Sequence, residues 1–364
     1  MNNRIKSLFV CLFCVLCSQV AAQTVYYDAD QFPLIGKTSS ETETRYERLP
    51  ACLKDVCRPP VWNLGKNSSG LAIRFRTNST AISAKWEVTN DNRMSHMTET
   101  GIKGLDLYAW EKDHWQPVRA AIPSGKVNER TIISDMTPQD REFMLFLPLY
   151  DGVILLSIGI DSAAYIQDPA LPFPDTSHPV LVYGTSITQG GCASRPGMSY
   201  TNILTRRLNR EVINLGFSGN GKLDFEIAEL MATRHDASLF ILDFIPNVDS
   251  ILLKEKTRPF FERLRKSNPD IPILFVETII YPHSFYDKNT HQIITEKNRL
   301  LREEFEIIKR AGEKNVYYLA NDGLIGQDGE ASVDGIHLTD LGFYRLAERM
   351  YNTIVEILTK ISDL

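Results

Sequence analysis

The distribution of hydrophobic and polar positions divides the chain into two parts with different periodicities. From Thr24 to about Gln167, short alternating or apolar segments are separated by clusters of Gly, Asn, Ser and Pro, without a helix-period stretch of useful length. This spacing predicts an all-β sandwich, and strands this short favour a jelly-roll-like arrangement. Strands are expected at Leu71–Phe75, Ile82–Val88, Leu105–Trp110, Glu142–Leu147 and Val153–Ile160.

A proline-rich segment, DPALPFPDTSHP, follows at residues 168–179 and predicts an extended linker between a domain at 23–167 and a second domain at 180–364. Beyond it, apolar strands alternate with helices, which predicts an α/β domain with a mainly parallel sheet covered on both faces. Strands are expected at Val180–Tyr183, Val212–Leu215, Leu239–Asp243, Ile273–Val276 and Val316–Leu319, and helices at Tyr200–Leu208, Leu223–Ala232, Ile251–Lys266, Thr290–Ala311 and Thr339–Leu358.

Composition and charge exclude several classes of protein. The chain is 43% hydrophobic and 23% charged, which is typical of a folded globular protein. Its formal net charge of −5 is spread without long like-sign runs. Because nucleic acids and anionic membranes are recognised by clustered basic residues, we expect no nucleic-acid partner.

Residues 1–22 have the pattern of a signal peptide. Arg4 and Lys6 precede an apolar run, Leu8–Cys17, and small residues end the segment at Ala22. The run is half of the roughly 20 residues that a spanning helix needs, so an uncleaved membrane anchor is the alternative. We expect cleavage near Ala22, export to the periplasm or the medium, and no stable membrane insertion afterwards.

Three cysteines remain after that predicted cleavage, too few for a disulfide scaffold. In an oxidising compartment Cys52 and Cys57 could close a small loop, which leaves Cys192 unpaired. We expect the Cys52–Cys57 bridge.

Polar and glycine-rich segments follow the predicted strands of the second domain. Ser186 lies in GTSITQGG after the first strand, and NLGFSGNGK after the second contains Gly216, Gly219 and Gly221. Asn247 ends DFIPN after the third strand. Ligands of such sheets bind at the carboxyl ends of the strands, so these groups are expected in one crevice.

A possible general base precedes the last helix. Asp334 and His337 are three residues apart in DGIH, where a carboxylate can hold one imidazole nitrogen while the other faces outward. Together with Ser186 at a strand end, the pair indicates nucleophilic catalysis by a serine.

The four blocks GTSITQGG, NLGFSGNGK, DFIPN and DGIH resemble those of the SGNH (GDSL-like) hydrolases, in the same order and across the whole second domain. GLDLY at Gly104–Tyr108 resembles the GxDLY domain that precedes the hydrolase domain in one bacterial branch. The resemblance implies a three-layer, flavodoxin-like hydrolase domain with a five-stranded sheet, and a serine esterase that needs no cofactor.

The resemblance also implies the site residues. Ser186 would be the nucleophile, His337 the base and Asp334 its partner. The amides of Ser186 and Gly219 and the side chain of Asn247 would form the oxyanion hole, with Gly219 placed by its spacing from Asn214. One position departs from the family: Thr185 stands where GDS has aspartate, so that aspartate's local hydrogen bonds are missing.

Two other chemistries fit parts of the sequence. Gly216–Lys222 spells GxxxxGK and Asp243 ends a Walker-B-like strand, but Leu223 stands where a P-loop has Ser or Thr. Cys192 could serve as nucleophile with His337. The histidines form no HxH or HExxH pattern, and we predict no metal requirement.

The expected function is that of an exported esterase that hydrolyses O-acyl, most specifically O-acetyl, esters of small-molecule or polysaccharide carbohydrates. Thr188–Ser199 is polar, small and Gly-rich, without an apolar lid, which suits a hydrated substrate. The alternatives are a lipid or small-ester esterase and a non-catalytic glycan-binding protein. The four tryptophans, Trp62, Trp86, Trp110 and Trp115, could line a sugar platform or fill the core.

Overall fold

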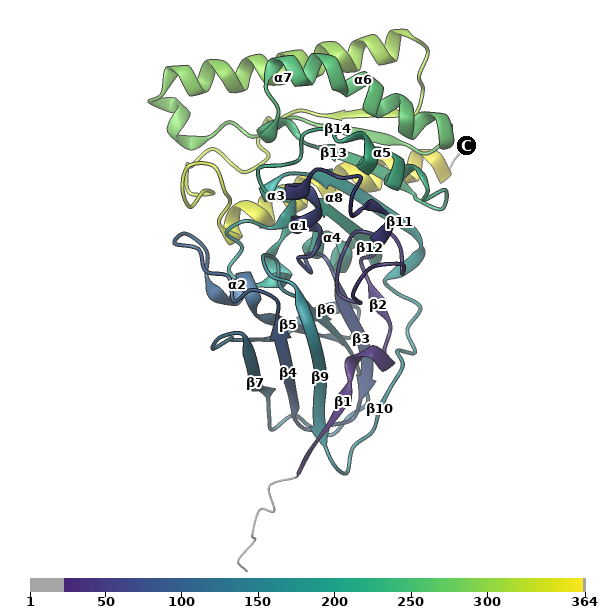
Figure 1. Cartoon of the computed structure of the whole chain (residues 1–364), viewed down its shortest axis with the longest axis vertical. Coiled ribbons are helices and arrows are strands. Elements are labelled where there is room, and N and C mark those ends of the chain that lie inside the picture. Colours follow the sequence, from purple (N-terminus) through teal and green to yellow (C-terminus); the bar gives the residue numbers. More distant parts are fainter. Residues whose placement is uncertain (1–22, 363–364) are drawn as a thin grey trace, which may run out of the picture.

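The computed structural model describes residues 23–362 of the 364-residue chain. Figure 1 shows an antiparallel β-rich N-terminal part packed against a C-terminal α/β part, and the predicted fold class is confirmed. The predicted signal peptide lies outside the described residues. Within residues 23–362, no helix is both long and apolar enough to cross a bilayer.

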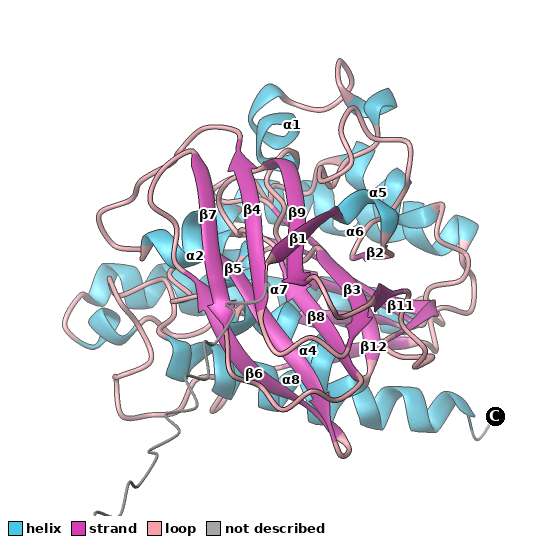
Figure 2. Cartoon of the chain, turned by 90° about the horizontal axis from the view of Figure 1, so that it is seen from below, coloured by secondary structure: helices cyan, strands magenta, loops and turns pink. Residues whose placement is uncertain are grey.

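Two antiparallel sheets form the N-terminal part. Their strands are β1 (Thr24–Asp28), β2 (Leu34–Ile35), β3 (Ala72–Thr77), β4 (Ile82–Val88), β5 (Leu105–Glu111), β6 (His114–Ala121), β7 (Val127–Ile133), β8 (Arg141–Phe146), β9 (Val153–Asp161) and β10 (Ile166–Gln167). One sheet has the order β1-β9-β4-β7 and faces the viewer in Figure 2; the other has the order β10-β3-β8-β5-β6, with β2 beside β3. Inward side chains such as Phe75, Trp86 and Leu107 form the shared core.

The N-terminal part contains elements that the sequence pattern did not predict. β6 and β7 present mostly exposed side chains, so they carry little hydrophobic signal. Two short helices, α1 (Pro59–Gly65) and α2 (Glu99–Lys103), lie in the connections, where two turns or fewer cannot show a helical period.

A parallel five-stranded sheet forms the centre of the C-terminal part. Its strands are β11 (Asp175–Gly184), β12 (Arg210–Gly216), β13 (Leu239–Asp243), β14 (Ile273–Val276) and β15 (Val316–Leu319), and its helices are α3 (Ser186–Gln189), α4 (Tyr200–Leu208), α5 (Phe225–Ala232), α6 (Ser250–Ser267), α7 (Lys288–Arg310) and α8 (Asp340–Ser362). The order β12-β11-β13-β14-β15 is the flavodoxin-like one.

Side chains of β11 alternate between the two faces of this sheet. Val180 and Val182 pack on the face covered by α4 and α8, whereas Leu181 and Tyr183 pack on the face covered by α5, α6 and α7. A strand that is buried on both faces has no polar side, which explains its continuous apolar sequence.

Several element boundaries differ from the prediction, and two of the differences have a local cause. β11 begins at Asp175, inside the segment predicted as linker, because the Asp175 amide donates to Asn209 O of the neighbouring strand region at 2.8 Å. α5 begins at Phe225 rather than Leu223, whose φ of 58° is incompatible with a right-handed helix.

The expected disulfide is also absent: Cys52 and Cys57 are both free thiols. Cys57 is buried in the hydrophobic cluster that includes Val61 and Trp62, while Cys52 is exposed to solvent. Cys57 thus contributes to the hydrophobic core as a free thiol.

The GLDLY segment joins the two parts of the molecule. Asp106 is fully buried and accepts hydrogen bonds from Arg195 Nη1 at 2.6 Å and from the Gly197 amide at 2.8 Å. Arg195 also donates to Tyr108 Oη, and Arg206 of α4 lies over the Tyr108 ring. A buried acid paired in this way fixes the sandwich against the segment between α3 and α4.

Candidate active site

Ser186 is the first residue of α3, directly past the carboxyl end of β11, and is 6% exposed. Thr185 caps this helix: its side chain accepts from Ile187 N, and its amide donates to Thr188 Oγ1 at 3.3 Å. The two threonines form a capping box. Thr185, which replaces the family's usual aspartate, thus makes local hydrogen bonds of its own.

The turn after Ser186 is held by backbone hydrogen bonds. The backbone carbonyl of Ser186 accepts hydrogen bonds from the amides of Gly190 and Gly191 at 3.0 and 2.7 Å. Gly190 has a φ of 102°, and a Cβ on Gly191 would lie 3.1 Å from His337 Cδ2. Glycine at both positions lets the chain turn beneath the imidazole.

His337 links Ser186 to Asp334. Its Nε2 lies 2.9 Å from Ser186 Oγ, and its Nδ1 lies 2.7 Å from Asp334 Oδ2. With Asp334 ionised, Nδ1 donates to the carboxylate and Nε2 accepts from the serine hydroxyl. This is the arrangement of a nucleophile, a base and an orienting acid.

The carboxylate of Asp334 is stabilised by its own loop. Its Oδ1 accepts from the amides of Ile336 and His337 at 2.9 and 2.8 Å. Burial alone would raise the pKa of Asp334, but hydrogen bonds from the His337 side chain and these amides lower the pKa to about 2. Asp334 is therefore ionised throughout the neutral range.

Gly219 and Asn247 lie in the same cavity as Ser186 and His337, with a volume of about 480 Å³. Gly219 has a φ of 67°, and a Cβ there would meet nothing within 4 Å, so its backbone faces open space. Asn247 Oδ1 accepts from the Gly221 amide at 3.1 Å. This bond leaves Asn247 Nδ2 as the donor directed away from Gly221.

The structure thus brings together every predicted site residue: Ser186, Gly219, Asn247, Asp334 and His337.

Asp243, at the end of β13, supports the serine turn. It accepts from Thr188 Oγ1 at 3.0 Å and from Tyr200 Oη at 2.8 Å. Burial raises its pKa to about 6, against the effect of these two hydrogen bonds. In the sequence, Asp243 is an acid that ends an apolar strand, a pattern that fitted a nucleotide site and did not reveal this supporting role.

The N-terminal part also holds the catalytic turn. Gln189 Nε2 donates to Leu149 O at 3.1 Å, and Ser69 Oγ donates to Gln189 O at 2.6 Å. The Gln189 Oε1 atom in turn accepts from the Ser218 amide at 3.0 Å, next to Gly219. No sequence motif indicated these contacts, because they join residues far apart in the chain.

Four groups able to ligate a metal meet beside the catalytic pair: His96, Cys192, Asp334 and His337 have ligand atoms within 4.8 Å of one another. The His96 ring, from the loop before α2, lies 5.6 Å from that of His337. Burial raises the pKa of Cys192 to about 12, with a further contribution from Asp334. Its thiol is neutral, so it is a poor nucleophile.

One expectation about the substrate surface is wrong, and the open question about the tryptophans is answered in favour of the core. The segment Thr188–Ser199 does not face the cavity but is mostly buried between the two parts of the molecule. The tryptophans are packed rather than arranged as a platform: Trp62, Trp86 and Trp115 are buried, and Trp110 packs edge-on against Trp115.

Comparison with known proteins places the chain in a family. Two family models match it, the GDSL-like lipase/acylhydrolase family at residues 177–356 and the N-terminus of SGNH-hydrolase-type esterases at residues 24–166. The structure of a candidate GDSL-like lipase from Bacteroides ovatus ATCC 8483 is 37% identical, with a TM-score of 0.88 over 93% of this chain and 98% of that one. The chain belongs to the GDSL-like lipase/acylhydrolase family. This GDSL-like hydrolase is an ester-hydrolysing enzyme.

More distant structures share the fold of the GDSL-like hydrolase. The salicylyl-acyltransferase SsfX3 from a tetracycline biosynthetic pathway is 17% identical, with a TM-score of 0.75 over 93% of this chain and 98% of that one. The acetyl xylan esterase Est2A from the rumen bacterium Butyrivibrio proteoclasticus is 12% identical, with a TM-score of 0.57 over 93% and 99%. Among curated proteins, none matches this hydrolase.

Proposed function

We propose that this GDSL-like hydrolase removes O-acetyl groups from carbohydrates through an acyl-enzyme intermediate on Ser186. The observation that carries the proposal is the continuous series of hydrogen bonds from Ser186 through His337 to Asp334, at the edge of a cavity that also contains Gly219 and Asn247.

In the proposed reaction, Ser186 Oγ attacks the ester carbonyl carbon while its proton passes to His337 Nε2. The amides of Ser186 and Gly219 and the side chain of Asn247 stabilise the negative oxygen that forms. The ester C–O bond then breaks, and His337 returns the proton to the leaving alcohol. Water, deprotonated by His337, attacks the acyl carbon and releases acetic acid, which restores Ser186.

Carbohydrate acetyl esters are favoured for two reasons. The Est2A acetyl xylan esterase has the same fold. The cavity also has polar side chains among apolar ones: Thr278, His283 and Lys297 line it with Ile293 and Ile294. A lipid esterase would need a more continuous apolar surface.

Export completes the proposal. The pattern of residues 1–22 predicts cleavage near Ala22, and polymeric carbohydrate esters are met outside the cytoplasm. Amino-terminal sequencing of the protein from expressing bacterial cells should find Gln23 first; a retained Met1 would contradict export by this route.

The Ser186→Ala variant tests the catalytic proposal. It should reduce hydrolysis of p-nitrophenyl acetate to near background and abolish labelling by a fluorophosphonate, because no other group in the cavity replaces the nucleophile. Cys192→Ala is the matched control and should retain activity. Substantial esterase activity in Ser186→Ala would reject the mechanism, and lack of any activity in the wild type would favour a glycan-binding protein.

A series of esters of increasing chain length tests the substrate: preference for chains of about eight carbons or more would favour a lipid esterase.

A further inference from the structure

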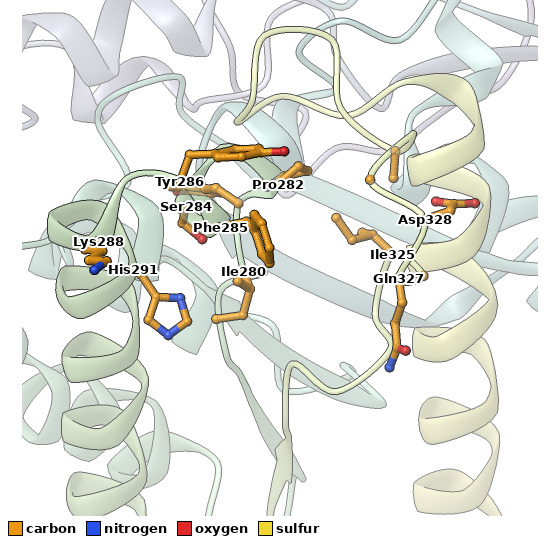
Figure 3. A pocket seen from close by; sticks show the side chains of 14 residues that line it. Ile280, Pro282, Ser284, Phe285, Tyr286, Lys288, His291, Ile325, Gln327 and Asp328 are labelled. Carbon is orange, nitrogen blue, oxygen red and sulfur yellow. The ribbon is translucent and has the colours of Figure 1, made fainter.

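A second cavity, of about 690 Å³, adjoins the catalytic one, and Tyr281 lines both. Figure 3 shows its two walls. One wall is the 3-10 helix η5 (Pro282–Phe285) with Tyr286 and the start of α7; the other is the segment Ile325–Asp328 near the start of α8. None of the proposed catalytic groups lines this second cavity.

Two aromatic side chains of this cavity are exposed to solvent. Phe285 is 81% exposed and Tyr286 is 85% exposed, more than any other large hydrophobic side chain in the described part of the chain. Their rings meet edge-on at 5.0 Å. Two adjacent exposed aromatic rings at the edge of a cavity form a candidate surface for a ligand.

The second cavity borders the segment that leads to His337. His337 gives its proton to the leaving alcohol, so that alcohol is next to the His337 loop. The segment Ile325–Asp328 leads into this loop. On the opposite wall, His283 hydrogen-bonds through Nδ1 to Gly335 O at 3.1 Å, which joins η5 to the same loop.

The chemistry of the cavity fits a sugar better than an acyl chain. Aromatic faces stack on the C–H faces of sugar rings, and polar side chains bind the hydroxyls. Here Lys288, His291 and Gln327 accompany the aromatic rings. Ser284 also lines the cavity, but its side chain is buried, so the polar contacts available to a ligand come from these three side chains.

We propose that this cavity is a glycan subsite, in which Phe285 and Tyr286 hold the sugar residue next to the one that carries the scissile acetyl group. The inference rests on the proposed function and adds the substrate class: an oligosaccharide or polysaccharide rather than a small acetyl ester.

The test compares two substrates in one pair of variants. The double variant Phe285→Ala/Tyr286→Ala loses two ring contacts, so its kcat/KM on acetylated xylo-oligosaccharides should fall about tenfold or more. Its kcat/KM on p-nitrophenyl acetate should stay within about twofold of the wild-type value. Phe285→Trp/Tyr286→Trp should retain activity on the oligosaccharides. Leu155→Ala, an exposed position on β9, is the control and should change neither substrate.

Each other outcome overturns the inference. Equal losses on both substrates would make the rings structural supports of η5, and unchanged activity on the oligosaccharides would show that the cavity binds no sugar. A loss confined to long-chain acyl esters would assign the cavity to the acyl group. If the wild type hydrolyses p-nitrophenyl acetate but releases no acetate from the oligosaccharides, the proposed function fails as well; if it releases acetate and the alanine variant does so equally, the subsite alone fails.

Discussion

The side-chain oxygen of Asn247 accepts a hydrogen bond from the Gly221 amide, which leaves the side-chain NH2 group for the substrate. Asn247→Ala should therefore lower kcat for p-nitrophenyl acetate by about 10² to 10³, the usual cost of one oxyanion donor, with little change in KM. Steady-state kinetics measure this. Lys222→Ala, on the same loop as Gly221, is the control and should stay within about threefold. If Lys222→Ala lowered kcat more than Asn247→Ala, and if the wild type bound a nucleotide that Lys222→Ala no longer bound, the result would support a P-loop instead.

The group His96, Cys192, Asp334 and His337 should make the enzyme sensitive to zinc. Zn²⁺ prefers nitrogen and thiolate ligands, and binding here would withdraw His337 from Ser186. Excess Zn²⁺ should inhibit ester hydrolysis, and Cys192→Ser should raise the inhibitory concentration about tenfold through loss of one ligand. A chelator should leave the activity of the purified enzyme unchanged.

Cys52→Ser is the control for that experiment, because Cys52 is exposed and lies outside the group. Equal zinc sensitivity in Cys192→Ser and the wild type would place the inhibitory ion elsewhere, and loss of activity on chelation would contradict the predicted absence of a metal requirement.

The proposed catalytic residues could be predicted from the sequence because each lies directly after a strand or before a helix of one parallel sheet. Ser186, Asn247 and His337 thus converge by topology alone. His96 and Phe285 could not be predicted in this way. His96 comes from a loop of the other part of the molecule, and Phe285 lies on a turn whose path depends on tertiary packing.

At the scale of elements, β12 should make stability depend on pH. Glu211 is buried on this strand and accepts from the Gly36 amide at 2.5 Å. Burial raises its pKa to about 7, although this amide and Arg234 act in the opposite direction. Between its ordinary pKa and about 7, the folded protein keeps a proton that the unfolded chain has lost. The contribution to stability is therefore complete at low pH and is lost as the pH rises, by about 3 kcal/mol in total.

A glutamine side chain cannot ionise, so Glu211→Gln should remove this loss of stability at high pH. Urea unfolding at about pH 5 and about pH 8 should show the variant gaining stability relative to the wild type as the pH rises. Glu129→Gln, an exposed position on β7, is the control and should follow the wild type closely. Parallel pH curves for Glu211→Gln and the wild type would contradict the assignment.

The strands of the parallel sheet were predicted closely because they are buried on both faces. Residues on both faces are therefore apolar, which makes each strand a continuous apolar run in the sequence. β13, β14 and β15 have the predicted bounds. The strands of the sandwich were predicted less completely. β6 and β7 keep most of their side chains in solvent, so backbone pairing, rather than hydrophobic pattern, defines them.

At the scale of the whole molecule, Arg48 connects the two parts. It is 1% exposed, and its guanidinium donates to Gly216 O at 2.8 Å and Asn214 O at 3.1 Å across the junction. It also donates to Leu64 O and Asn67 O on its own side. Burial lowers the pKa of Arg48 to about 9, because the charged guanidinium loses its hydration. The hydrogen bonds to these carbonyls replace that hydration.

Arg48→Leu should destabilise the protein by about 3 kcal/mol, because several buried carbonyls lose their donor. Urea unfolding measures the loss, and kcat should fall as well because Gly216 ends β12, directly before the loop that carries Gly219. Arg119→Leu, exposed on β6, should leave both quantities nearly unchanged. Wild-type stability in Arg48→Leu would show that the junction does not depend on this guanidinium.

The position of Arg48 has a consequence for how such proteins can diverge. A binding module attached by a flexible tether can be exchanged between genes, since nothing in its neighbour depends on it. Here an arginine of the first part supplies hydrogen bonds to the backbone that leads into the proposed oxyanion loop of the second. Recombination at the junction would separate this arginine from its carbonyls, so the two parts are expected to be inherited together and to change in concert.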